Sequence, residues 1–412
     1  MSLLFKRLQK PSAYALAFLA LLLLISCTHT LKPSPPASDL YPNEPRAEID
    51  NIYVLGDSLS DTGNLFSLIN NLFLHTNIRM EVPPASLGGQ KFSNGYLVVE
   101  YIAAHYDLDL EIAWEPTSQK KKALKHINAE DVPGLTSWLT SFNNNGEAHQ
   151  KHHEAITLIS ENLGRKAKGN NYAVTNATII PYKGVLNRFF GQFSLAKQVD
   201  LHQSEPIEKI ASPNTLHFLI IGGNDIMMAM NMNSNQSAKE QKIRRIALAY
   251  VEQIERLQKI GAKKILVSTA PKIGDIPEFY NTSSRDQANH LSELLEQEVS
   301  QQIKQRFNDN QVAFVSLSEI LNQELNKWPQ QRQHQACVRD IASDYFNLEH
   351  FILHDGELTI KFINDCTQSA LTNGSFVYYD GFHGTDKLYQ LIARHLHLHQ
   401  RHQYTDAMSP LS

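Results

Sequence analysis

IYVLGDSLSDTGN, residues 52–64, begins with four apolar residues and changes character at a glycine. The apolar start predicts a short buried strand, and Gly56 predicts that this strand ends in a turn. Ser58 follows on that turn, where its hydroxyl would lie at the end of a strand. A serine in such a place is a candidate nucleophile, provided that other residues supply a base and an anion site.

The rest of the chain repeats the pattern of a strand followed by a helix. Beyond the first strand, β-like runs at 172–174, 216–221, 264–268 and 312–315 predict four more strands. Helical spacing marks 238–260, which Gly261 should stop, and 286–307. Such alternation predicts an α/β fold, in which helices cover both faces of a parallel sheet.

A base for the serine must be sought among 18 histidines. Asp380 and His383 narrow the choice, because their spacing lets one loop aim a carboxylate at one imidazole nitrogen and the other nitrogen at a serine. A structural role is the alternative, since Thr385-Asp386 could cap the helix that follows. Both can hold if the loop leads into that helix.

These segments occur in the order of the sequence blocks of the GDSL, or SGNH, family of esterases and lipases, which the chain resembles from about residue 51 to residue 397. The run GDSLSDTGN resembles block I, with Ser58 as nucleophile, and Asp380-x-x-His383 resembles block V. The spacing is not the Gly-x-Ser-x-Gly turn of α/β-hydrolases, because Ser60 replaces the second glycine. The resemblance implies a three-layer α/β/α sandwich, flavodoxin-like, with a mainly parallel five-stranded sheet.

The resemblance also implies an oxyanion hole. Gly222-Gly223-Asn224-Asp225 looks like block III, whose asparagine amide is a donor, and the backbone N–H of Ser58 should be a second donor. NYAVTNAT, residues 171–178, resembles block II, but Thr175 and Asn176 stand where the family has glycines. Asparagine tolerates left-handed backbone angles, so the N–H of Asn176 is the expected third donor. The alternative is a hole with two donors.

Two further segments resemble family landmarks and are expected to be structural. They are FSNGY, residues 92–96, followed by VVEY, residues 98–101, and SLAKQV, residues 194–199.

The first 27 residues predict a signal peptide, because Lys6, Arg7 and Lys10 precede an uncharged, largely apolar run at 13–25. The run ends in Leu-Ile-Ser-Cys, which resembles a bacterial lipobox with Cys27 as the lipidated residue; ordinary cleavage nearby is the alternative. Residues 28–47, rich in Pro and Ser, predict a tether. We expect one domain over 48–400, with a helical insertion at about 106–169, and a tail at 401–412.

Cys337 and Cys366 remain in the body, and an even pair in an exported protein predicts a disulfide. Such a bridge would stabilise the fold by about 3–4 kcal/mol in the chain-entropy model. The loop 337–366 carries several aromatic and aliphatic side chains. We consider a lid that an activating protease opens and, equally, a packed surface excursion.

The resemblance narrows the expected activity to lipid esters. The long block I with its FSNG landmark resembles bacterial lysophospholipases and glycerophospholipid–cholesterol acyltransferases, which also carry a disulfide-closed loop before block V. We therefore expect an exported phospholipase A or lysophospholipase that works at a membrane surface, with cholesterol as a candidate acyl acceptor. The alternatives are a short-chain or carbohydrate O-acetyl esterase and a noncatalytic surface-binding lipoprotein.

Charge and histidine content bear on other classes of function. A net charge of -4 gives no electrostatic case for nucleic acid. His395, His399 and His402 would share one helix face and could bind a metal, but a solvated tail is the preferred interpretation. The proposed chemistry requires neither a metal nor a cofactor.

Overall fold

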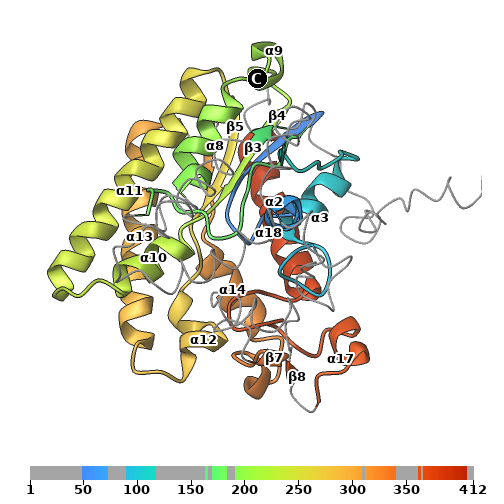
Figure 1. The fold of residues 1–412 in the computed structure, drawn as a ribbon, viewed down its shortest axis with the longest axis vertical. Coiled ribbons are helices and arrows are strands. Elements are labelled where there is room, and N and C mark those ends of the chain that lie inside the picture. The colour runs from blue at the N-terminus through green and yellow to red at the C-terminus, as the bar shows by residue number, and fades with distance from the viewer. Residues whose placement is uncertain are drawn as a thin grey trace, which may run out of the picture. The chain divides into compact units, whose positions relative to one another are not determined.

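Four parallel strands form the central sheet of the computed structural model, in the order β1-β4-β5-β6. Figure 1 shows two of them, β4 and β5, side by side. Their bounds are Asn51–Gly56, Thr215–Ile220, Lys264–Ser268 and Val312–Phe314. The structure describes residues 49–72, 90–116, 163–165, 169–182, 191–308, 311–339, 361–362 and 365–405, all of which lie in one compact unit, Pro36–Ser412. All six residues of β4 are buried, as expected of a strand with helices on both faces.

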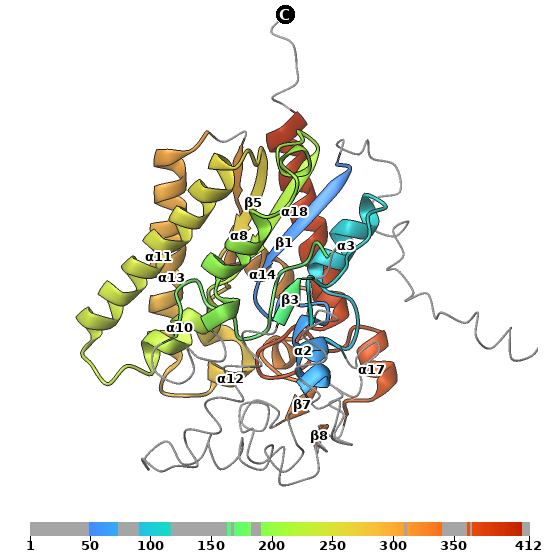
Figure 2. The ribbon, with the colours of Figure 1, turned by 45° about the horizontal axis from the view of Figure 1, so that its top comes forward.

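Helices cover both faces of this sheet. In Figure 2, α8, α11 and α13 lie on one side of β1 and β5, and α3 and α18 lie on the other. The longer helices are α2 Asn64–Leu72, α3 Val98–His105, α8 Leu195–His202, α10 Gly223–Met230, α11 Gln236–Lys259, α13 Arg285–Arg306, α14 Leu317–Leu325 and α18 Asp386–Thr405. The predicted α/β class is confirmed.

Local signals set the ends of these helices. The Asn235 side chain accepts a hydrogen bond from the Ala238 N–H and caps α11. After this helix, Gly261 adopts a φ of +104°, a left-handed conformation that favours glycine. The helices predicted at 238–260 and 286–307 are therefore present, each with ends shifted by one or two residues.

The prediction of a fifth strand at 172–174 is wrong. This segment lies beside β1, with hydrogen bonds from Tyr172 N to Val54 O (2.7 Å) and from Val54 N to Asn170 O (2.9 Å), but it forms only an isolated bridge. The next ladder hydrogen bond would join Gly56 N to Tyr172 O. Instead, Gly56 N donates to Gln198 Oε1 (2.8 Å) and Tyr172 O accepts from the Trp114 indole (2.9 Å). Side chains thus replace this one bond, although Val174 N still donates to Gly56 O (3.2 Å), and the segment is too irregular to count as a strand.

Shorter elements surround the sheet. They are α9 Ile207–Ile210, α12 Pro277–Tyr280, α17 Gln368–Thr372, the 3₁₀ turns Gly191–Phe193, Ile273–Asp275 and Gln330–Arg332, and two antiparallel pairs, β2 Trp114–Pro116 with β3 Leu163–Arg165 and β7 Val338–Arg339 with β8 Lys361–Phe362. The pair β2–β3 lies within the predicted insertion at about 106–169, whose residues 117–162 and 166–168 lie outside the described part. Within the described ranges, no helix is both long and apolar enough to cross a membrane.

The carboxyl ends of β1, β4 and β5 meet at one edge of the sheet. Gly56 ends β1 there, and a Cβ at this position would lie 2.5 Å from the Ile220 carbonyl oxygen at the end of β4. Only glycine allows this close approach of the two strands. Clefts of open α/β sheets form at this edge, so it is where a site should be sought.

Candidate active site

Ser58 lies on the turn that follows β1, where the sequence predicts it. The turn is closed by a hydrogen bond from Ser60 N to Asp57 O (3.0 Å), and the Asp57 carboxylate accepts from Leu59 N (3.1 Å). Ser58 is partly exposed, and its side chain lines a pocket at the edge of the sheet. The hydroxyl is thus accessible from the pocket while its backbone is fixed.

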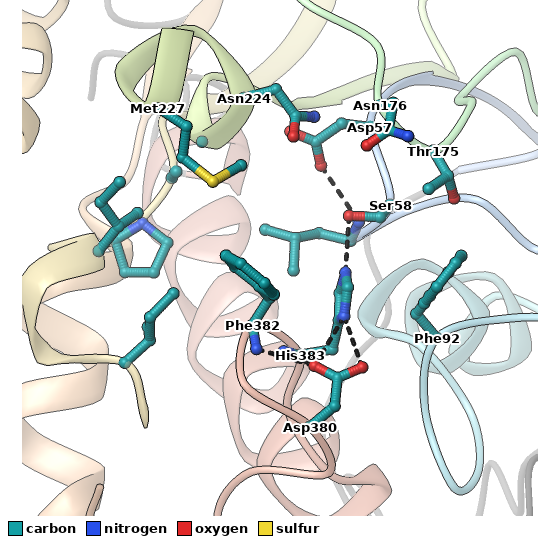
Figure 3. A pocket seen from close by; sticks show the side chains of 16 residues that line it. Asp57, Ser58, Phe92, Thr175, Asn176, Asn224, Met227, Asp380, Phe382 and His383 are labelled. Atoms are coloured by element: carbon teal, nitrogen blue, oxygen red, sulfur yellow. Dashed lines mark hydrogen bonds and ion pairs between the residues drawn. The ribbon is translucent and has the colours of Figure 1, made fainter. Parts of the chain in front are cut away.

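The predicted partners of Ser58 come from the other end of the chain and meet it in this pocket (Figure 3). The Nε2 atom of His383 lies 2.9 Å from Ser58 Oγ, and Nδ1 of the same ring lies 2.9 Å from each carboxylate oxygen of Asp380. Asp380 and His383 are 2% and 7% exposed, so little water competes for these hydrogen bonds. Ser58 and His383 lie 325 residues apart in the sequence, and the fold brings their side chains into contact.

The carboxylate decides which imidazole nitrogen carries the hydrogen. An ionised carboxylate can only accept, so Nδ1–H of His383 donates to Asp380. The Nε2 lone pair then faces Ser58 and can accept its hydroxyl hydrogen. This is the arrangement that a serine nucleophile needs from a general base.

The loop that holds Asp380 and His383 is braced by its own backbone. Asp380 Oδ1 accepts from His383 N (2.7 Å) and Phe382 N (2.8 Å), and Tyr379 N donates to His383 O (2.8 Å). Beyond the loop, α18 begins at Asp386. A loop that leads into this helix and also carries the aspartate–histidine pair reconciles the two interpretations of this segment.

Asn176 occupies the turn where the sequence departs from the family pattern. Its φ is +66°, in the left-handed region, and Ala177 N donates to Val174 O (2.9 Å) across the four-residue turn. A turn with positive φ at its third residue requires glycine or asparagine there. The backbone geometry of the missing glycine is therefore retained by Asn176, which lines the pocket beside Ser58.

Asn224 reaches the same pocket from the first turn of α10. Gly222, with a φ of +133°, lets the chain turn out of β4 into this helix. One hydrogen of the Asn224 amide is donated to Ala177 O (2.9 Å), and an amide nitrogen carries two. The other remains to serve a group bound in the pocket. Asn224 and Asn176 lie together on one side of Ser58 (Figure 3).

The buried carboxyl groups of Asp57 and Asp225 connect the loops that border the pocket. Asp57 accepts from Leu59 N and from Gly222 N (3.4 Å), and burial raises the pKa of Asp57 to about 6. Asp225 accepts from Ile179 N (2.8 Å), and burial raises its pKa to about 7. Both groups connect the loop after β4 with another segment that borders the pocket.

Asp61 joins the turn of Ser58 to the turn of Asn176. Its Oδ2 accepts from Thr175 N (2.8 Å) and Thr175 Oγ (3.0 Å), and its Oδ1 accepts from Gly63 N (2.9 Å) and Asn64 N (2.6 Å) at the start of α2. Burial raises the pKa of Asp61, and these donors act against that rise. The Asp61 carboxylate thus links the turn that carries Ser58 with the turn that carries Asn176.

The FSNGY landmark, expected to be structural, also contacts the site. The ring of Phe92 lies 4.9 Å from the His383 ring between centroids, and Phe92 lines the pocket. Tyr96 N and Tyr101 Oη donate to Asp386 Oδ1 (2.7 and 2.6 Å), at the first residue of α18. The landmark and the VVEY segment that follows it therefore anchor α18, and Phe92 also packs against the imidazole, a role that the sequence did not predict.

SLAKQV, the other landmark, is structural, as predicted. Gln198 is fully buried and bonds to the backbone of Gly56 and Phe193.

One wall of the pocket is apolar, and sequence reasoning missed all of its residues. They come from α10, from the segment after β5 and from the histidine loop, and they are Met227, Ala270, Pro271, Ile273, Ile276 and Phe382. Nothing in the local sequence distinguishes them from ordinary core residues, because only the fold brings them to Ser58.

Cys337 and Cys366 form the predicted disulfide, with 5.3 Å between their Cα atoms. Residues 340–360 of the enclosed loop lie outside the described part, as do Cys27, the predicted signal peptide and the tether. Helix α18 extends to Thr405, five residues into the predicted tail. His395 Nε2 lies 2.6 Å from Glu324 Oε1, and the described residues contain no cluster suited to a metal ion.

Comparison with known proteins agrees with this arrangement. A family model described as GDSL-like lipase/acylhydrolase matches residues 52–396. A GDSL esterase/lipase from Arabidopsis thaliana is 27% identical over 287 residues, which cover 64% of this chain and 70% of the relative. The family match spans the β1 turn, the turn of Asn176, Asn224 and the histidine loop. The chain therefore belongs to the GDSL-like lipase/acylhydrolase family, whose members hydrolyse lipids and other esters.

Proposed function

We propose that Ser58 is the nucleophile of this ester hydrolase, His383 its general base and Asp380 the group that orients His383. The observation that carries the proposal is the continuous hydrogen-bonded line from Ser58 Oγ through the imidazole to the carboxylate, with each step at 2.9 Å. A serine hydroxyl is a weak nucleophile until a base removes its proton, and this line supplies the base.

The reaction would proceed in two halves. Ser58 Oγ attacks the ester carbonyl carbon while its proton passes to His383 Nε2. The tetrahedral intermediate then expels the alcohol, which takes that proton, and the acyl group remains on Ser58. Water, or a second alcohol, gives its proton to His383 and attacks the acyl-serine. The bond to Ser58 Oγ then breaks, His383 returns the proton to Ser58, and the acid or a new ester is released.

The negative oxygen of the intermediate would be stabilised by three donors, the backbone N–H groups of Ser58 and Asn176 and the side-chain amide of Asn224. The left-handed backbone of Asn176 and the free hydrogen on the Asn224 amide support this assignment. Loss of one such donor costs about 10²–10³ in rate in serine hydrolases.

We further propose that the substrate is a membrane lipid, so that the enzyme is a phospholipase A or lysophospholipase with cholesterol as an additional acyl acceptor. The apolar wall formed by Met227, Pro271 and Ile276 supports a long acyl chain in place of an acetyl group. The resemblance of block I and of the disulfide-closed loop to bacterial acyltransferases supports the choice of lipid.

Export and surface location belong to the same proposal and rest on the sequence. The basic residues before the apolar run at 13–25 and the lipobox-like ending at Cys27 support secretion or a lipid anchor on the cell surface. Cleavage of the 337–366 loop by a protease would be the activating step. The intact mass of the protein, measured after expression with and without lipidation, would test whether Cys27 carries a lipid anchor.

One experiment tests the catalytic assignment and the substrate together. Purified protein, before and after limited proteolysis, is incubated with lysophospholipid, phospholipid, and phospholipid with cholesterol, and the products are separated. Free fatty acid is expected from the first two and cholesteryl ester from the third. Ser58→Ala should abolish all products, whereas Ser60→Ala, a matched change at a buried serine two residues away, should keep them.

Each departure has a distinct meaning. Fatty acid without cholesteryl ester would remove the transferase from the proposal. Hydrolysis limited to acetyl esters would favour a carbohydrate or short-chain esterase. Biological activity that survives Ser58→Ala would favour the noncatalytic lipoprotein.

A further inference from the structure

A second apolar cavity lies next to the pocket of Ser58. Four side chains line both spaces: Leu59, Pro271, Ile276 and Phe382. The inner walls of the second cavity come from α3, α14 and α18 and include Leu321, Leu388 and Ile392. Among the described residues, these four side chains form a wall common to the second cavity and the pocket of Ser58.

The second cavity suits a hydrocarbon. Among the described residues that line it, no side chain is charged. The hydroxyl of one lining residue, Tyr389, accepts a hydrogen bond from Gly384 N (2.9 Å). An occupant would gain contact with aliphatic and aromatic carbon and would find few polar partners.

The geometry around Ser58 gives the direction of the acyl chain. Figure 3 shows Met227 and Phe382 on one side of Ser58 and His383, with Phe92 on the opposite side and the two asparagines above them. The carbonyl oxygen belongs beside the asparagines, and the leaving alcohol must reach His383 Nε2. The remaining carbonyl substituent, the acyl chain, then extends over the apolar side that carries Phe382.

We propose that the acyl chain passes Leu59 and Phe382 and ends in the second cavity, which we call the acyl chamber. This inference rests on the proposed role of Ser58 and names the part of the substrate that the chamber selects. Leu321 on α14 lies in the inner wall and lines the chamber but not the pocket of Ser58. The size of the side chain at position 321 then sets the length of the acyl chain that the enzyme accepts.

The test is the chain-length profile of kcat/KM on p-nitrophenyl esters from butanoate to palmitate. Leu321→Phe should lower kcat/KM for the long esters at least about tenfold relative to butanoate, because one methylene in an apolar pocket changes rates by about 10–200-fold. Leu321→Ala should move the optimum to longer chains. The Leu321→Ala variant still tests the proposal if the Leu321→Phe variant does not fold.

Leu325→Phe is the matched control. Leu325 lies one turn further along α14 and is 7% exposed, as is Leu321, but it lines neither cavity. Its profile should follow the wild type. A wild-type profile in both Leu321 variants, with melting curves that show folded protein, would overturn the acyl chamber. So would a length dependence that changes in Met227→Phe alone, because the chain would then lie in the outer pocket.

Failure of the chamber and failure of the proposed function look different. If hydrolysis requires Ser58 but its chain-length profile ignores Leu321, only the chamber is lost. If wild type and Ser58→Ala process every ester equally, the catalytic assignment is lost and the chamber with it.

Discussion

Gln198 bonds both peptide groups of Gly56, two residues before Ser58. Its Oε1 accepts from Gly56 N (2.8 Å) and its Nε2 donates to Gly56 O (2.8 Å) and to Phe193 O (2.9 Å). Val174 N also donates to Gly56 O (3.2 Å), so the side-chain amide supplements the backbone of the neighbouring segment at the point where β1 ends. We expect the position of the Ser58 turn to depend on this amide as well as on the sheet.

Replacing Gln198 with Leu should weaken both fold and site. The buried N–H of Gly56 would lose its acceptor, which should lower the free energy of unfolding by about 1–3 kcal/mol in urea titrations. Because the turn of Ser58 would shift, kcat should fall more than KM rises. Gln203→Leu is the control, since Gln203 ends the same helix in an exposed position and should change neither quantity. An unchanged kcat in Gln198→Leu would argue that the turn positions itself.

The sequence predicts the site far better than it predicts the walls around it. Ser58, Asn224, Asp380 and His383 stand in short motifs whose chemistry is local, and the strands at 52–55 and 264–268 have apolar residues at 52–55 and 265–267. The expected strand at 172–174 fails for a nonlocal reason. Gly56 N bonds to the side chain of Gln198, which lies far along the chain, and not to Tyr172 O. The pattern of apolar residues at 172–174 contains no information about this distant partner.

The backbone of Asn176 should matter more than its side chain. Asn176→Gly keeps the N–H and accepts positive φ without strain, so kcat should stay within about twofold. Asn176→Val must strain a β-branched residue at a φ of +66°, which costs about 1–3 kcal/mol and moves the N–H. We expect a loss in kcat of about 10² or more.

Asp107 provides the control for this substitution. It is the other described non-glycine residue with positive φ (59°), and it lines neither cavity near Ser58. Asp107→Val should lower stability to a similar extent and leave kcat unchanged. Equal losses of kcat in the two valine variants would show that strain alone, and not the oxyanion donor, explains the effect.

Asp61→Asn should loosen the contact between the nucleophile turn and the Asn176 turn. An amide nitrogen would replace one oxygen and would face N–H groups that it cannot accept from, so the free energy of unfolding should fall by about 2–3 kcal/mol. The value of kcat should fall with it. Thr175→Val removes only the hydroxyl that bonds to Asp61 and should cost about 1 kcal/mol. A larger effect from Thr175→Val than from Asp61→Asn would contradict this account.

His217 should make the protein sensitive to acid. It is buried in β4, its Nε2 lies 3.0 Å from His202 Nε2, and burial lowers its pKa from 6.5 to about 4. Because the unfolded chain binds the proton more readily, stability is lost as the pH falls from about 6.5 towards 4. The loss should reach about 3 kcal/mol, since one pKa unit corresponds to about 1.4 kcal/mol.

The comparison of wild type with His217→Asn isolates this contribution. Asp57 and Asp225 act in the opposite direction, because burial raises their pKa values to about 6 and about 7, but they act equally in both proteins. The variant should be less stable at pH 7 and should lose less stability between pH 6.5 and 4. Parallel curves of unfolding free energy against pH would exclude His217 as the source.

The disulfide should affect catalysis as well as stability, because its first cysteine is bonded to the chain just before Asp380. Cys337 N donates to Tyr378 O (3.1 Å), and Val338 N donates to Tyr379 O (2.8 Å). Cys337, Cys366, Phe376 and Tyr379 also belong to one small buried cluster. Replacing both cysteines with serine should lower the free energy of unfolding by about 3–4 kcal/mol in the chain-entropy model. At a temperature where the variant stays folded, kcat should still fall, since Asp380 would be held less firmly, and rescue of kcat by a lower assay temperature would tie the loss to mobility of the Asp380 segment.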